Sequence, residues 1–228
     1  MKNWFPFTDY DFYAYISAGV IVIAGIDYTL FGAVLVGRAE WTIVQGVFWT
    51  MFSYLVGHIT AGLSSFALEQ MLINKVFCSP VLIILGLRKP RWFERLFKLL
   101  FAREYSAFPT ENSDMILDKL ASSLKCERSS LRDSETIFQT AFLVSRYETT
   151  SEVRLNQFMN QYGLCRNVAF AFLLVAVLLA WKRLCQPAEM DGWLLLGSLL
   201  MAGGMYGRFL KFYSAYSREI LRTFGRKA

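Results

Sequence analysis

Residues 12–37 read FYAYISAGVIVIAGIDYTLFGAVLVG, and residues 41–68 read WTIVQGVFWTMFSYLVGHITAGLSSFAL. The first stretch contains a single side chain of the Asp, Glu, Lys or Arg set, Asp27, and the second contains none. A helix needs about 20 apolar residues to cross the roughly 30 Å hydrocarbon core of a bilayer, so each stretch is long enough. Neither stretch shows the alternation of a membrane β-barrel strand. We therefore predict two transmembrane helices within residues 12–68.

Two shorter apolar stretches near the C-terminus predict a second pair of spans. Asn167 to Trp181 and Gly192 to Gly207 each lack Asp, Glu, Lys and Arg. Each would measure only about 23 Å as a helix, so the basic side chains that flank it must snorkel towards the headgroups. The alternative is a buried helical hairpin in a soluble domain, but the rest of the chain offers little that could bury it.

The composition of the whole chain agrees with a membrane protein. Of 228 residues, 55% are hydrophobic and 18% are charged, against about 25% charged in ordinary globular domains. The mean hydropathy is +0.35. We predict an all-α integral membrane protein with four transmembrane helices and a helical cytoplasmic segment between spans 2 and 3. Because Asp9 and Asp11 precede a long first block, we do not expect a cleaved signal.

The charges around the spans predict the orientation. The tail after Gly207 holds six Lys or Arg, including Arg208 and Lys211, against one acid. By the positive-inside rule, both termini should lie in the cytoplasm and the protein in the inner (cytoplasmic) membrane, although Lys182 and Arg183 argue mildly against this. The predicted parts are the cytoplasmic N-terminus (1–11), spans 1 and 2 (12–68), the cytoplasmic segment (69–150), a long helix entering span 3 followed by span 4 (151–207), and the basic cytoplasmic tail (208–228).

The segment between spans 2 and 3 predicts a helix that lies on the membrane. In residues 91–103, basic side chains gather on one side of a helix and apolar ones on the other, which is typical of a helix in an anionic headgroup layer. Its headgroup contacts would be Arg91, Trp92, Arg95 and Lys98, with Arg208 and Lys211 in the tail. The alternative is packing on the rest of the segment. Residues 76–87 contain Pro80 and are too short to span, so they predict an interfacial or re-entrant piece.

The polar part of this segment predicts two modest helices, over residues 113–125 and 134–147. About 40 residues bury little core alone, so we expect this part to pack weakly on itself, on a neighbouring subunit or on a cytoplasmic protein partner. Thr149 and Glu152 have the spacing of a capping box, and no proline follows until Pro187. One helix from about Ser151 to Leu184 would then project some 20 Å beneath the membrane.

The sequence contains little that indicates catalysis. Its single histidine excludes most histidine-based metal sites and triads, and the phosphate-binding and nucleophile motifs GxxxxGK[ST], GxGxxG and GxSxG are missing. We therefore expect no enzyme, no metal and no cofactor. The four cysteines do not form a disulfide framework. The net charge of +6 is accounted for by the basic flanks and anionic lipids, so we expect no direct nucleic-acid binding.

Asp27 and His58 are the two ionisable groups inside the predicted spans. An ionisable side chain at the bilayer centre costs about 2.5–3.5 kcal/mol on insertion scales, so each should face the bundle interior, a cavity or another subunit. Asp27 either serves as polar glue between helices or lines an ion or proton pathway. The two lie about 12 Å apart in depth if both helices are continuous, too far for a direct pair. For His58 an interhelical hydrogen bond is the simpler interpretation.

Small residues recur every four positions in the predicted spans and indicate close helix packing, within the subunit or between copies. They are Gly25, Thr29, Ala33 and Gly37 in span 1, Ser53, Gly57, Ala61 and Ser65 in span 2, and Gly203 and Gly207 in span 4.

These patterns lead to two functional hypotheses. The first is a small oligomeric inner-membrane protein that acts as a pore, sensor or anchor with a cytoplasmic partner; stress and phage-defence membrane components often have this form, which is an analogy only. The second is a proton- or ion-coupled transporter or channel that uses Asp27 and His58. The four spans show no internal repeat, which counts against a transporter.

Overall fold

The computed structural model describes residues 12–69, 80–88, 106–131, 133–145, 149–186 and 188–226, and every element in this part of the chain is helical. The N-terminus, residues 76–79 and the predicted headgroup helix 91–103 lie outside the described residues. In chain order the elements are η1 (Phe12–Ile16), α2 (Ser17–Ile26), η2 (Asp27–Phe31), α3 (Ile43–Ser64), α4 (Pro80–Ile84), α6 (Thr110–Leu124), η4 (Arg128–Ser130), α7 (Ser134–Ser145), α8 (Thr149–Cys185) and α9 (Glu189–Arg226).

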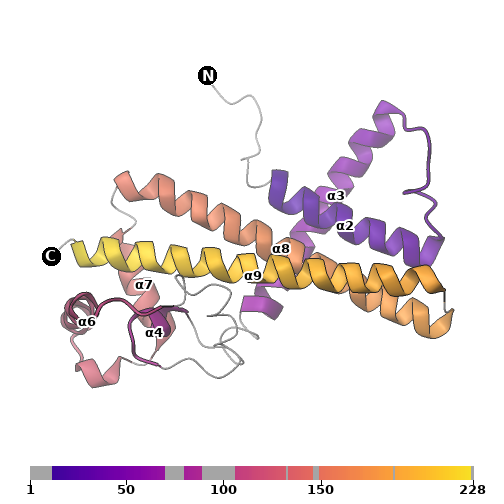
Figure 1. The fold of residues 1–228 in the computed structure, drawn as a ribbon. Coiled ribbons are helices and arrows are strands. Elements are labelled where there is room, and N and C mark those ends of the chain that lie inside the picture. Colours follow the sequence, from indigo (N-terminus) through magenta and orange to yellow (C-terminus); the bar gives the residue numbers. More distant parts are fainter. Residues whose placement is uncertain are drawn as a thin grey trace. The chain divides into compact units, whose positions relative to one another are not determined.

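Four of the described helices are long and apolar enough to cross a membrane. They cover Tyr13–Phe31, Ile43–Glu69, Arg154–Cys185 and Glu189–Arg226, each with an 18-residue window of mean hydropathy between 1.2 and 2.1. The prediction of an all-helical chain with four potential spans is thus confirmed, and the fold is compatible with a multi-pass membrane protein. α8 and α9 are the longest, with 37 and 38 residues, and both appear as unbroken ribbons (Figure 1).

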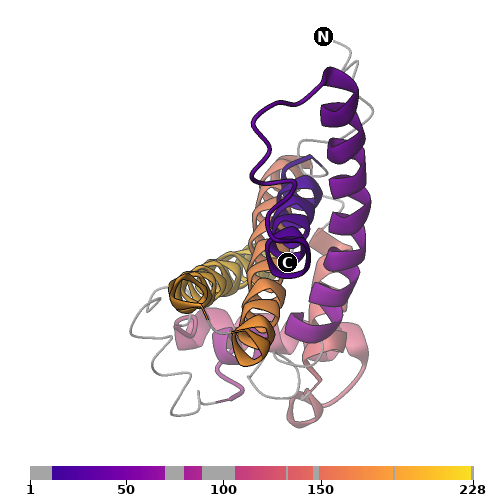
Figure 2. The same cartoon turned by 90° about the vertical axis from the view of Figure 1, so that its right-hand side faces the viewer.

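The first helix is shorter than the sequence predicted. η1, α2 and η2 follow one another without a break, and the helix ends at Phe31 because Gly32 takes the left-handed conformation with φ +71°. Ala33 also has a positive φ, of 64°, so the chain cannot continue as a helix. Residues 32–42 form a loop with a turn at residues 34–37, so the last six residues of the first apolar stretch lie outside the helix (Figure 2). Asp27 therefore lies one turn from the end of its helix.

The start of α3 is fixed by a capping box. The Thr42 hydroxyl accepts a hydrogen bond from the Gln45 backbone N–H, and the Gln45 side chain accepts one from the Thr42 N–H. This reciprocal pair satisfies donors that the first turn of a helix otherwise leaves free. The loop thus ends at a defined residue, which fixes where α3 begins.

The chain divides into two compact units, Met1–Glu69 with Gly163–Phe209 (unit 1), and Gln70–Tyr162 with Leu210–Ala228 (unit 2). In unit 1 the helices approach through small residues. A Cβ on Gly19 would lie 1.8 Å from the Ser53 carbonyl oxygen, and one on Gly57 would lie 1.9 Å from that of Tyr15. A Cβ on Gly25 would lie 2.5 Å from Val175 of α8. Glycine at these positions therefore lets α2 contact both α3 and α8 closely.

Much of the apolar surface of unit 1 stays exposed. On α3 the exposed large side chains are Ile43, Val44, Val47, Phe48, Met51, Phe52, Leu55, Ile59 and Leu63. On α9 they are Trp193, Leu194, Leu196, Leu199, Leu200 and Met201. Contiguous apolar surface on this scale is unusual for a protein in water and is expected for helices in contact with lipid or with other copies.

Unit 2 has a hydrophobic core, so of the alternatives that we expected, weak packing of its helices on themselves is not what the structure shows. The core joins Ile84 of α4, Leu120 of α6 and Ile137 of α7 to Leu155 of α8. The end of α9 adds Tyr216, Ile220, Leu221 and Phe224 to the same core. The sequence suggested only a basic tail at 208–228, whereas α9 continues through Arg226 and supplies the missing core.

Candidate functional site

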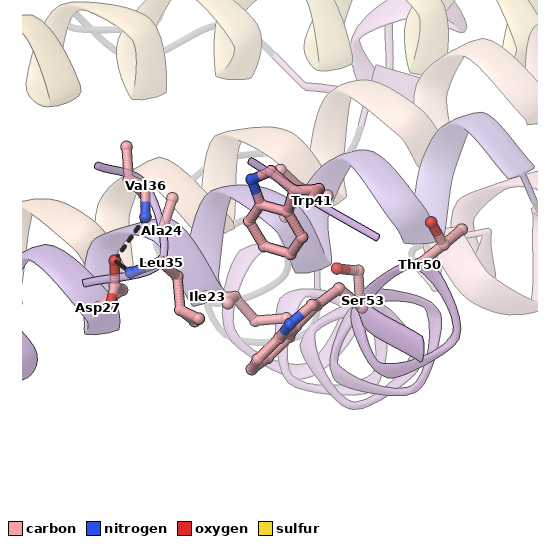
Figure 3. Close-up of a pocket in the computed structure, with 10 residues that line it drawn as sticks. Ile23, Ala24, Asp27, Leu35, Val36, Trp41, Thr50 and Ser53 are labelled. Atoms are coloured by element: carbon pink, nitrogen blue, oxygen red, sulfur yellow. Dashed lines mark hydrogen bonds between the residues drawn. The ribbon is translucent and has the colours of Figure 1, made fainter. Parts of the chain in front are cut away.

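The main cavity of unit 1 lies between α2, α3 and the loop that joins them (Figure 3). It encloses about 220 Å³ and has a mostly apolar lining that includes Val20, Ile23, Leu35 and both Trp41 and Trp49. Thr50 and Ser53 add hydroxyl groups, and Asp27 is the single acid. No cationic side chain of the described residues lines this cavity. It is therefore an apolar space with one buried carboxylate.

Asp27 holds the loop against the end of the helix. Its side chain is 2% exposed, and Oδ2 accepts hydrogen bonds from the backbone N–H groups of Leu35 and Val36, each at 2.9 Å. Figure 3 shows both bonds at one end of the cavity. The other oxygen, Oδ1, is buried and has no hydrogen-bond partner among the described residues. A buried polar atom without a partner costs free energy, and Oδ1 has no compensating donor among the described residues.

His58 does not join Asp27. Its ring stacks on Tyr15 of η1, with the centroids 3.9 Å apart, and meets Tyr54 edge-on at 4.6 Å. Tyr15 and Asp27 are twelve residues apart along one helix, which corresponds to about 18 Å. His58 is exposed rather than buried between helices, so the interhelical hydrogen bond that we expected gives way to an aromatic stack. The structure does not bring the two predicted polar residues into one site.

A polar network at one end of α8 was missed from the sequence. Asp191 is fully buried, accepts a hydrogen bond from the Tyr28 hydroxyl at 2.8 Å, and lies 3.6 Å from the Lys182 ammonium. The Lys182 ammonium also donates to the Tyr28 carbonyl at 3.3 Å and lies 3.9 Å from the centre of the Tyr28 ring. This network links η2, α8 and α9. The positions of Tyr28, Lys182 and Asp191 in the sequence do not predict that they contact one another.

A second network links α3 to α8. The Asn167 side chain is fully buried and accepts a hydrogen bond from the Ser64 hydroxyl at 2.7 Å. Beside it, the Arg166 guanidinium and the Glu69 carboxylate form an ion pair at 2.6 Å. Asn167 and Lys182 are fifteen residues apart on one helix, or about 22 Å. The two networks therefore bracket the apolar length of α8.

The predicted packing stripes are only partly reproduced. Gly25, Ser53, Gly57 and Ala61 are buried, and the Thr29 hydroxyl donates to the Gly25 carbonyl. Ala33 and Gly37 lie in the loop after the helix end, so the span 1 stripe stops at Thr29. The Ser65 hydroxyl donates to Glu69 instead of lying in a tight contact.

The two glycines of α9 that we predicted to pack closely, Gly203 and Gly207, differ in their burial. Gly207 is buried, whereas a Cβ on Gly203 would meet nothing within 4 Å. Gly19, which makes one of the two closest backbone contacts, was absent from the predicted stripes although it lies in the same apolar block. A spacing rule of four from Gly25 does not reach it.

Of the predicted headgroup residues, the structure describes two. Arg208 and Lys211 are both exposed on α9, which leaves them accessible to an anionic surface. Arg91, Trp92, Arg95 and Lys98 lie outside the described residues.

Unit 2 carries a cavity of opposite character. It encloses about 330 Å³ and is lined by Phe108, Asn112 and Ile116 together with Arg222 and Arg226 of α9. The Arg222 guanidinium lies 5.7 Å from the centre of the Phe108 ring. No acidic side chain of the described residues lines it. The cavity therefore favours an anionic group.

No family model, curated protein or solved structure matches this chain. Its function must therefore be argued from the geometry of the two units. The described residues also contain no group of three His, Cys, Asp or Glu side chains that could hold a metal ion.

Proposed function

We propose that this chain is a membrane sensor or anchor of the cytoplasmic membrane, in which unit 2 binds a cytoplasmic partner and passes that event to the spans. One observation carries the proposal. α8 runs without a break from Thr149 to Cys185, and it contributes Leu155 to the core of unit 2 and Val175 to the packing of unit 1. A continuous helix embedded in two cores cannot shift in one without loading the other.

The end of α9 supports the same proposal. Its last turns supply Ile220, Leu221 and Phe224 to the core of unit 2, while its first turn holds Asp191 in the network with Lys182. A tail that merely followed the last span would need no buried face. The cavity lined by Arg222 and Arg226 is cationic, so it would accept an acidic group of the partner.

Hydrogen exchange on the intact chain in detergent tests the coupling. Leu120→Ala creates a void in the core of unit 2, where this side chain is fully buried. We expect faster exchange in α6 and α7 and also along α8 beyond Gly163. The matched control is Leu143→Ala, because Leu143 lies on α7 with 58% of its surface exposed. If the effect of Leu120→Ala stops at Tyr162, the proposed coupling is wrong.

The assembly state and the orientation belong to the proposal as well. The open faces at Gly203 and along α3 favour a homo-oligomer, and the six basic residues after Gly207 favour a cytoplasmic tail. The mass of the nanodisc-embedded particle tests the first, and a strict monomer would remove a pore. Labelling of single cysteines placed in the loop 32–42 and at the C-terminus, from each side of the membrane, tests the second.

Ion- or proton-coupled transport is the alternative. It requires Asp27 and His58 to serve one pathway, but Asp27 clamps a loop and His58 stacks on Tyr15. The separation of about 18 Å along the first helix leaves no direct route between them. Transport would be supported if proton flux into liposomes were lost in both Asp27→Asn and His58→Gln while folding was kept.

A further inference from the structure

We propose that the cavity beside Asp27 binds the head of a lipophilic primary ammonium. The argument begins with the carboxylate. Asp27 is 2% exposed, Oδ2 is occupied by the two loop N–H groups, and Oδ1 is buried without a partner in the described part of the chain. A desolvated carboxylate oxygen is stabilised most by a charged donor, because charge-assisted hydrogen bonds are roughly twice as strong as neutral ones.

The lining of the cavity shows that the chain itself does not supply that charge. Its polar lining consists of Asp27, Thr50 and Ser53, and no Lys, Arg or His of the described residues reaches it. The nearby Lys182 ammonium is engaged with Asp191 and Tyr28. None of these described side chains supplies the positive charge, and we assign that charge to a ligand.

The rest of the cavity lining indicates that the ligand carries an apolar chain next to its ammonium group. Val20, Ile23 and Leu35 offer aliphatic surface, and Trp41 and Trp49 offer indole rings. Drug-sized ligand sites usually enclose about 300–1,000 Å³, so a cavity of about 220 Å³ suits the head and first methylenes of an amphiphile. Asp27 lies one turn from the end of its helix and Trp41 lies in the loop, which matches the depth at which an amphiphile places its head.

An aminophospholipid and a free alkylamine share this chemistry, and the experiment separates them. The probe for the free amine is 12-bromododecylammonium, titrated into the full chain in neutral maltoside micelles. Bromine quenches nearby tryptophans, and the signal from Trp41 and Trp49 is isolated by subtracting a variant in which both are Phe. We expect saturable quenching, with 12-bromododecanol at least about tenfold weaker because it lacks the charge.

Two variants test the site in different ways. Asp27→Asn keeps a carbonyl oxygen for the loop N–H groups but removes the charge, so we expect at least about tenfold weaker ammonium binding and little change for the alcohol. Ala24→Phe fills the cavity and leaves the carboxylate, so we expect the saturable phase to disappear. Glu189→Gln is the control, because it removes an exposed acid of α9 and should leave binding unchanged. Thermal unfolding checks that each variant is folded.

The source of the ammonium is read from lipid nanodiscs. If the ligand is an aminophospholipid, phosphatidylethanolamine nanodiscs should block the probe whereas phosphatidylglycerol nanodiscs should not. If it is a free amine, the probe should bind in both. The proposal is overturned if the folded chain shows only non-saturable quenching, if Asp27→Asn binds the ammonium as the unaltered chain does, or if the alcohol and the ammonium bind alike. Asp27 would then be a loop clamp alone.

Discussion

The helices inside unit 1 and the helices inside unit 2 pack in opposite ways. In unit 1 the closest contacts are made by residues that lack side-chain bulk, so that Gly19 and Gly57 place backbone against backbone. In unit 2 the contacts are made by large side chains, with Leu120, Ile137 and Phe224 almost completely buried. Unit 1 leaves long apolar faces open, whereas unit 2 collects its large apolar side chains around one core.

This difference fits the proposal that unit 1 lies in lipid and unit 2 in water. In water, burying a large apolar side chain is favourable, so a core of leucine and phenylalanine stabilises the fold. In lipid, the surroundings are as apolar as leucine itself, and helices associate through close packing and polar contacts. The contrast predicts that unit 2 is sensitive to the removal of bulk, and that unit 1 is sensitive to its addition.

The largest effect should follow removal of bulk from unit 2. Phe224 is 1% exposed, so Phe224→Ala should cost about 3–5 kcal/mol of local stability through lost burial and an unfilled cavity. Hydrogen exchange of α6 in the intact chain measures this loss. Leu143→Ala, on the exposed face of α7, should change it by less than about 0.5 kcal/mol. Equal effects of the two substitutions would show that unit 2 lacks a water-type core.

Addition of one methyl group should damage unit 1 almost as much. A Cβ at Gly57 would lie 1.9 Å from the Tyr15 carbonyl oxygen, so Gly57→Ala must separate η1 from α3 and should cost about 3 kcal/mol. Gly62→Ala is a matched control on the same helix, because its Cβ would meet nothing within 4 Å and alanine favours helix. Unfolding in mixed micelles compares the two. A Gly57→Ala chain as stable as Gly62→Ala would contradict the close approach.

The sequence predicted the spans well, because membrane thickness fixes how many apolar residues a helix needs. The block at 41–68, which has no Asp, Glu, Lys or Arg, and the block at 12–37, which has only Asp27, predicted the first two helices. The end of the first helix could not be predicted in this way, since residues 32–37, the first part of the loop, are as apolar as the helix before them. What stops the helix is the conformation of Gly32 and Ala33, and nothing in the composition of an apolar block reveals it.

The sequence identified single residues of the candidate site but not the contacts between them. Asp27 stands out because an acid in an apolar block is costly, but its loop bonds and its free Oδ1 depend on the helix ending at Phe31. Lys182 and Asp191 look like the flanks of two spans and gave no sign of pairing with Tyr28. The core residues at the end of α9 were not predicted, because the interpretation of that stretch rested on its six basic residues. Periodicity within it would have indicated an amphipathic helix.

Removing a charge from the network at the end of α8 should have an intermediate effect. Asp191 is fully buried, so Asp191→Asn leaves the Lys182 ammonium without its counter-charge and should cost about 1.5–3 kcal/mol. Glu189→Gln, an exposed acid two residues earlier, should cost less than about 0.5 kcal/mol. Unfolding in mixed micelles is again the measurement. If both variants match the unaltered chain, close packing alone holds unit 1 together.

The smallest effect should come from the helix cap of α7, and it should depend on pH. Asp133 accepts hydrogen bonds from the Thr136 hydroxyl and from the backbone N–H groups of Glu135 and Thr136, and these bonds lower the pKa of its carboxyl group. At pH 7, Asp133→Ala should cost α7 about 1 kcal/mol, which is typical for loss of an N-cap. Hydrogen exchange of α7 in the intact chain measures it.

The pH dependence of this cap separates its charge from its hydrogen bonds. Because the folded pKa lies below the unfolded value of about 3.9, the charge-dependent part of the stabilisation is complete above that value. It is lost as the pH falls through the lower, folded pKa. Asp133→Asn keeps a capping oxygen without a charge, so it should cost less than Asp133→Ala at pH 7 and show no such loss in acid. Should the unaltered chain and Asp133→Asn respond alike to acid, the carboxylate charge of Asp133 contributes nothing to the stability of α7.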